Sequence, residues 1–164
     1  MENIKIIDGH THLYNPHSIE YLAQSAFKHS FDKFCVMSLS CTGMQSITQN
    51  LLCALAKIMY PGKIFAYGGL FYPEDPAGAD GRDLLNQAVG LRQLGFDGMK
   101  MMEGKPDTRK KTGLPLDSPA FDEYYSYLET EQIPLLYHVA DPAAFWEINR
   151  ISPNAIREGW FYGK

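Results

Sequence analysis

Short apolar segments alternate with longer amphipathic segments along this chain. The length and composition of the apolar segments predict five β-strands, at residues 4–8, 33–39, 63–72, 97–102 and 133–140. Apolar residues at helical spacing predict helices at residues 17–30, 44–60, 79–95 and 117–132. Strands that alternate with helices of this length pair in parallel through right-handed crossovers. The pattern therefore predicts an α/β fold, either an open doubly wound sheet or part of a (β/α) barrel.

The composition of the chain is that of an ordinary globular protein, and we expect residues 1–164 to form a single domain. The net charge of −4 gives no electrostatic reason to expect nucleic acid or an anionic membrane as a partner. The N-terminal segment lacks the pattern of a signal peptide, and no apolar run approaches the roughly 18 residues of a membrane-spanning helix. The sequence therefore predicts a cytoplasmic protein.

The first predicted strand leads into an acid and two histidines in the stretch IIDGHTHLY, residues 6–14. Residues two apart on a strand point to the same side, so we expect Asp8, His10 and His12 to share one face. Two neutral imidazoles placed in this way can bind one divalent cation, and a nearby carboxylate can orient a ring or join the metal ligands. A hydrogen-bonded pair of histidines without a metal is the alternative. A doubly wound nucleotide-binding sheet usually has a glycine-rich turn here, so the histidines favour the barrel.

A third histidine, His138, ends the fifth predicted strand in PLLYHVADP. The carboxyl ends of the strands of a parallel barrel lie on one side of it. We therefore expect His138 to approach His10 and His12, as a third metal ligand or as a group that contacts substrate. Asp141, which precedes Pro142, is expected to begin a helix.

A basic segment, EGKPDTRKKTGLPL at residues 103–116, follows the fourth predicted strand and contains Lys105, Arg109, Lys110 and Lys111. Its length predicts an irregular loop. Such a loop can cover a site that binds an anionic group, or it can be an ordinary solvated connection.

Three segments resemble the amidohydrolase superfamily, in particular the amidohydrolase-related TIM-barrel metal-dependent hydrolases: DGHTH, GFDGMKMMEGKP and LLYHVADPAAFWE. The resemblance runs over the whole chain. It implies a distorted (β/α) barrel with one or two divalent metal ions, often zinc, that activate water against an amide, ester or related bond of a small-molecule substrate. By position, the resemblance makes His10 and His12 the first-strand metal ligands and His138 the fifth-strand histidine. We expect Asp8 to contact these ligands rather than the metal.

Lys100 falls on the fourth predicted strand. Some members of the superfamily have a carboxylated lysine on that strand, where it bridges two metal ions. Others have no such lysine, and a residue that contacts substrate or the backbone is the alternative for Lys100.

The resemblance also implies a histidine at the end of a sixth strand and an aspartate, the general base, at the end of an eighth. A full barrel has eight β/α units, of which this sequence supplies about five, so the fold is expected to be an incomplete TIM-type barrel and the catalytic base is unassigned. We expect those residues to come from another chain or from sequence beyond Lys164. An open barrel also predicts a homodimer, a larger homo-oligomer or pairing with a complementary barrel fragment. A decarboxylase-type relative and an inactive half-barrel that self-associates are the alternatives to a hydrolase.

Overall fold

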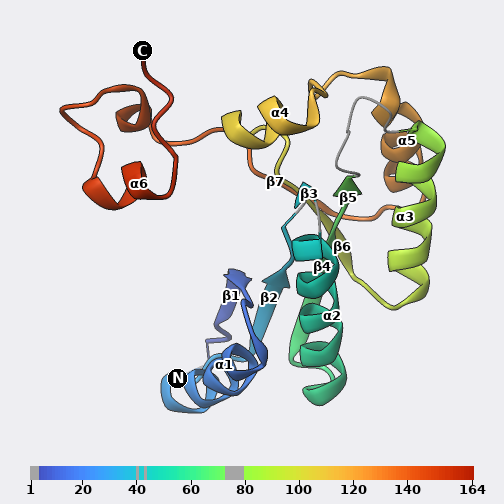
Figure 1. Ribbon diagram of the computed structural model, residues 1–164. Helices are drawn as coiled ribbons and strands as arrows, with labels where there is room; N and C mark the ends of the chain where they lie inside the picture. Colours follow the sequence, from blue (N-terminus) through green and yellow to red (C-terminus); the bar gives the residue numbers. More distant parts are fainter. Residues whose placement is uncertain (1–3, 40, 43, 73–79) are drawn as a thin grey trace.

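The computed structural model describes residues 4–39, 41–42, 44–72 and 80–164 (Figure 1). Its main sheet is entirely parallel, and the strands lie in the order β1-β2-β4-β6-β7. These strands are β1 (Ile7–His12), β2 (Lys33–Met37), β4 (Ile64–Gly69), β6 (Gly98–Met101) and β7 (Leu135–Tyr137). All five predicted strands are confirmed in position, although the first begins three residues later than expected and so contains Asp8, His10 and His12.

A second sheet of two short parallel strands, β3 (Cys41–Thr42) and β5 (Phe71–Tyr72), was not predicted. The predicted strand 63–72 is therefore divided between two sheets. Side-chain amides stabilise this division because they bond the backbone on both sides of Leu70. Asn50 bonds the N–H and the carbonyl of Gly69, each at 2.9 Å, and Gln87 does the same for Phe71 at 2.8 and 3.0 Å.

The four predicted helices are confirmed as α1 (Pro16–His29), α2 (Met44–Met59), α3 (Gly81–Gln93) and α5 (Asp122–Thr130), the last preceded by a 3₁₀ turn, η2 (Pro119–Phe121). Their ends follow ordinary capping chemistry. The Asn15 side chain accepts a hydrogen bond from the backbone N–H of Ser18 at 3.0 Å, and Asp80 accepts one from the N–H of Arg82 at 3.0 Å.

The prediction of an irregular loop at residues 103–116 was wrong, because the segment contains a further helix, α4 (Pro106–Thr112). Pro106 occupies the first helical turn, where a missing N–H does no harm. Gly113 ends the helix in the left-handed conformation with φ of 64°, which glycine adopts without strain. Pro106 and Gly113 are therefore sequence signals for the start and the end of a helix, within a stretch whose basic composition resembles that of a loop.

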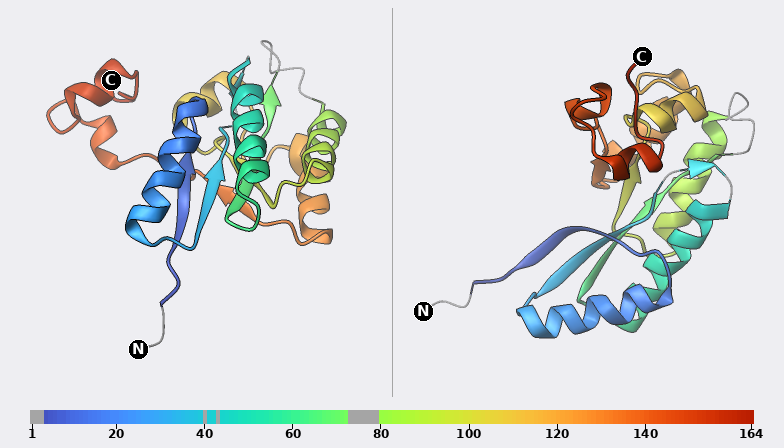
Figure 2. Two further views of the ribbon diagram at one scale, coloured as in Figure 1. Left: turned by 90° about the horizontal axis from the view of Figure 1, so that it is seen from below. Right: turned by 60° about the vertical axis from the view of Figure 1, so that its left-hand side comes forward.

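Helices α1, α2, α3 and α5 cover one face of the curled sheet (Figure 2). Alternate strand residues, among them Phe34, Val36 and Met99, point to that face and form the apolar core. On the opposite face, Cys35 and Tyr67 are only partly buried. The chain is therefore an α/β protein with a curled parallel sheet that has the outline of half a barrel.

After β7 the chain leaves the sheet and forms a small lobe (Figure 1). The lobe contains a 3₁₀ helix, η3 (Ala143–Trp146), and a short helix, α6 (Pro153–Arg157). Among the helices in the described part of the chain, none has the length and apolar character that a membrane span requires.

We expect Gly98→Ala to lower the free energy of unfolding by about 1–3 kcal/mol, the usual cost of an added methyl group in a tightly packed position. A Cβ at Gly98 would contact the ring of Tyr67, its partner on β4, and would lie 2.7 Å from the carbonyl oxygen of Pro134, which cannot move aside as a side chain can. Urea denaturation measures the change.

Gly90→Ala on α3 is the matched control for this substitution. A Cβ at Gly90 has no neighbouring atom within 4 Å, and alanine is favoured over glycine inside a helix by about 0.5–1 kcal/mol. This variant should be as stable as the original chain or more stable. The account of packing across β4 and β6 is wrong if Gly98→Ala is the better tolerated of the two.

Candidate functional site

The rings of His10 and His12 converge on one point beside β1. Their Nε2 atoms are 3.0 Å apart, and the rings meet edge to face with centroids 4.8 Å apart. The expectation that His10 and His12 share one face of the strand is confirmed. Asp8 pairs with Phe34, a residue of the apolar core, and the register shifts after it, so the expectation that Asp8 shares that face is wrong. The Asp8 carboxylate accepts the backbone N–H of His10 at 2.9 Å, where the register of β1 against β2 is irregular. Asp8 thus shapes the strand that carries the two imidazoles.

The position of the proton on His12 follows from its second ring nitrogen. Nδ1 of His12 lies 2.8 Å from the carbonyl oxygen of Met37, at the end of β2. A carbonyl oxygen can only accept a hydrogen bond, so Nδ1 carries the proton and Nε2 presents a lone pair. In this arrangement His10 donates from its own Nε2 to His12. A cation placed between the two rings would replace that proton.

Burial lowers the pKa of both His10 and His12, and electrostatic interaction with Lys100 and with His138 lowers these pKa values further. For His12 the hydrogen bond to Met37 raises the pKa, but this effect is smaller than the lowering caused by burial. Both rings are therefore neutral at physiological pH, which is the form that binds a metal ion. His12 and His138 also line one pocket, which is described below.

Lys100 lies on β6 and is almost completely buried, with 1% of its surface exposed. Burial lowers the pKa of its amine, and the Glu103 carboxylate opposes that effect. Lys100 therefore lies inside the protein, on the fourth of the strands predicted from the sequence.

His138 follows β7 and is held by a carboxylate. Its Nε2 atom lies 2.9 Å from Oδ1 of Asp141, and the other oxygen of Asp141 accepts the hydroxyl of Tyr162 at 2.8 Å. Burial and the bond to Asp141 raise the pKa of Tyr162, so its hydroxyl stays protonated and donates. A carboxylate can only accept from the ring, which leaves Nδ1 of His138 with the lone pair.

Asp141 and Tyr162 join the site, although neither was predicted to do so. Asp141 was expected to begin a helix, but the 3₁₀ helix that follows has no side-chain cap, and the Asp141 carboxylate turns to His138 instead. The spacing of three residues between His138 and Asp141 was an available signal. Tyr162 lies 21 residues beyond Asp141, and no local pattern indicates that the two will meet.

A pocket of about 310 Å³ lies beside the carboxyl ends of β1, β6 and β7. It is lined by His12, Tyr14, Leu39, Met102, Lys105, His138, Asp141, Pro142, Phe145 and Trp160. Two of the three predicted metal-binding histidines therefore face one space. Its volume is at the lower end of the roughly 300–1,000 Å³ typical of small-molecule sites.

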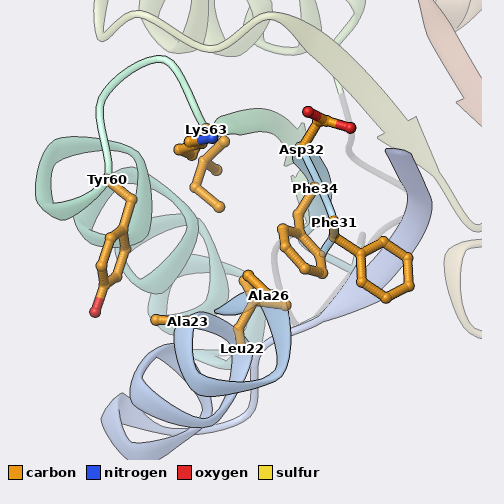
Figure 3. A pocket seen from close by; sticks show the side chains of 9 residues that line it. Leu22, Ala23, Ala26, Phe31, Asp32, Phe34, Tyr60 and Lys63 are labelled. Atoms are coloured by element: carbon orange, nitrogen blue, oxygen red, sulfur yellow. The ribbon is translucent and has the colours of Figure 1, made fainter. Parts of the chain in front are cut away.

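A second, smaller pocket of about 100 Å³ lies between α1, α2 and the amino ends of β2 and β4 (Figure 3). It is lined by Leu22, Ala23, Ala26, Phe31, Asp32, Phe34, Tyr60, Lys63 and Ile64. The Asp32 carboxylate already accepts the backbone N–H of Ile6 at 2.7 Å. This pocket contains none of the predicted site residues. The pocket of about 310 Å³ is the candidate site because both His12 and His138 line it.

The described residues contain no group of three or more His, Cys, Asp or Glu side chains that could hold a metal ion. The His10–His12 pair supplies two nitrogen donors, and His138 lines the same pocket as His12 but is bonded to Asp141. The structure thus brings two nitrogen donors into contact and does not add a third ligand to them among the residues that it describes.

Comparison of the chain with protein-family models, with curated proteins and with solved structures finds no match. The likeness to the amidohydrolase superfamily therefore rests on the sequence motifs alone.

The hydrogen bonds predict the tautomers of two histidines. At a pH where both rings are neutral, His12 should carry its proton on Nδ1 and His138 on Nε2, because Met37 and Asp141 can only accept. Two-bond ¹H–¹⁵N correlation spectra distinguish these tautomers. A proton on Nε2 of His12 in the metal-free chain would contradict the described geometry of β1 against β2.

Proposed function

We propose that this chain is a metal-dependent hydrolase of the amidohydrolase type that acts on a small molecule. The observation that carries the proposal is the pair of His10 and His12, neutral and 3.0 Å apart at Nε2, beside a pocket that His138 also lines. A bound divalent ion, zinc in the first place, supplies a polarised water molecule and a Lewis acid for the cleavage of an amide, ester or related bond.

The two imidazoles fit such an ion. Nitrogen ligands lie about 2.0–2.1 Å from zinc, so two of them in a tetrahedral arrangement are about 3.3 Å apart. The observed separation of 3.0 Å needs only a small opening of the rings. The Met37 carbonyl, bonded to Nδ1 of His12, fixes that ring with its lone pair toward His10, which is the support that metal-binding histidines commonly have.

Lys100 is proposed as a residue that bridges metal ions or binds substrate. Its lowered pKa favours the neutral amine, and only a neutral amine can be carboxylated. The curled parallel sheet supports a barrel of the TIM type, in which catalytic residues gather at the carboxyl ends of the strands.

The general base is not assigned to a residue of this chain. Asp8 is engaged with the backbone of β1, and both oxygens of Asp141 are engaged with His138 and Tyr162. These bonds give the two carboxylates structural roles in the described site. A decarboxylase-type reaction at the same site is the catalytic alternative, and a survey of esters, amides and carboxylic acids as substrates separates the two.

Changing His10 and His12 together to alanine should reduce bound zinc from one ion per chain to none, because both nitrogen donors of the pair are lost. Elemental analysis after dialysis measures the zinc. His29→Ala, at the exposed end of α1, is the matched control and should keep the full zinc content. The assignment fails if the double variant binds as much zinc as the control.

We also propose that the chain associates through the open side of its sheet, either with a second copy of itself or with a complementary barrel fragment. The observation that favours this is the uncovered side of the half-barrel, where Cys35, Phe65 and Tyr67 are partly exposed and β1 and β7 form the two edges. Ile4, Ile6 and Ile7 are also exposed at the start of the β1 edge. Apolar faces and free strand edges of this kind favour pairing.

Light scattering at micromolar concentration should therefore give a mass of at least twice the 18.5 kDa of one chain. Lys33→Glu with Tyr67→Glu, two charges on the uncovered face, should shift the mass toward that of the monomer. A stable monomer for the unmodified chain would contradict the proposal of self-association, and would leave the zinc assignment untouched.

A further inference from the structure

Lys105 places a largely buried ammonium group at the candidate pocket. Its side chain is 11% exposed, and its Nζ lies 3.0 Å from Oδ2 of Asp107 and 4.7 Å from the ring centroid of Trp160. Gly104, the residue before Lys105, packs closely against the segment that follows β7. A Cβ at Gly104 would lie only 2.8 Å from the carbonyl oxygen of Val139. This close contact brings Lys105 to the pocket that His138 lines.

An ammonium group has three donors. Lys105 can therefore keep its bond to Asp107 and its position over Trp160 while it donates to a ligand. Asp107 is itself fixed, because its other oxygen accepts the backbone N–H of Thr108 at 2.7 Å. The cation is thus held in place before any ligand binds, which reduces the entropy lost on binding.

The wall next to Lys105 contains two aromatic rings. Phe145 and Trp160 are stacked, with centroids 5.9 Å apart and ring planes 19° from parallel. Tyr14, Leu39 and Met102 add further apolar surface to the lining. Such walls suit a planar apolar group.

The charged groups near Lys105 leave room for an anion. Asp107, which lies outside the pocket lining, balances one positive charge, and its two oxygens already bond Lys105 and the backbone N–H of Thr108. The lining contains one carboxylate, Asp141, and both of its oxygens are already bonded, to His138 and to Tyr162. Arg109, Lys110 and Lys111 in the last turn of α4 add positive charge to the helix that begins next to Lys105.

We infer that the pocket binds a small organic carboxylate, with its carboxylate group on Lys105 and its flat apolar part against Trp160 and Phe145. The inference rests on the proposed function, for which it names the substrate class. The end of the ligand away from Lys105 then lies toward His12 and His138, where the proposed chemistry takes place.

Benzoate and benzamide test the inference, because they have the same shape and differ in charge. Binding of each to the full chain is followed by the Trp160 indole N–H signal in ¹H–¹⁵N spectra, first after treatment with a chelator and then with zinc added. Benzoate should bind without zinc, and at least about tenfold more tightly than benzamide, the factor that one charge-assisted hydrogen bond provides.

Three variants place the effect on Lys105. Lys105→Met should weaken benzoate binding about tenfold or more, and Lys105→Arg, which keeps the charge, should stay within about threefold of the original chain. Lys110→Met is the matched control on the exposed surface of α4 and should bind benzoate unchanged.

Equal binding of benzoate and benzamide, or full benzoate binding by Lys105→Met, would overturn the inference. Benzoate binding that requires zinc and ignores Lys105 would also overturn it, while supporting the metal site. Benzoate binding through Lys105 in a chain that fails to take up zinc when zinc is added would support the carboxylate site and contradict the proposed metal-dependent function. The two proposals can therefore fail separately.

Discussion

The parallel pairing of the five main strands is the constraint on which the candidate site depends. Because every strand runs in the same direction, the strands that carry or precede His12, Lys100 and His138 all have their carboxyl ends at the same edge of the sheet. The curl of the sheet then turns its two edge strands, β1 and β7, toward a common pocket. Residues more than a hundred positions apart in the sequence, such as His12 and His138, come to line one pocket in this way although their strands are not neighbours in the sheet.

The sheet alone does not make the pocket. One wall comes from the lobe that follows β7, whose Phe145 and Trp160 stack on one another, and another part comes from the segment before α4. The lobe is tied to the sheet at two points, by Tyr162 on Asp141 and by Trp160 beneath the ammonium of Lys105. The geometry around His138 therefore depends on a segment that contributes nothing to the sheet.

Local patterns predicted the parts of the fold that depend on local physics. A period of two placed His10 and His12 on one face, and helical spacing with ordinary caps located the four main helices. Side-chain bonds over longer range were not predictable in the same way. The division of β4 from β5 depends on Asn50 and Gln87, two amides on helices whose partners only the folded chain reveals. The bond from Tyr162 to Asp141 is of the same kind.

X-ray absorption at the zinc edge tests the central claim most directly, on the chain loaded with one equivalent of zinc. The account predicts a first coordination shell of nitrogen and oxygen at about 2.0–2.1 Å, with the multiple-scattering signature of at least two imidazoles, because His10 and His12 share the ion. A shell of oxygen atoms without imidazole scattering, or one with sulfur at about 2.3 Å, would contradict it.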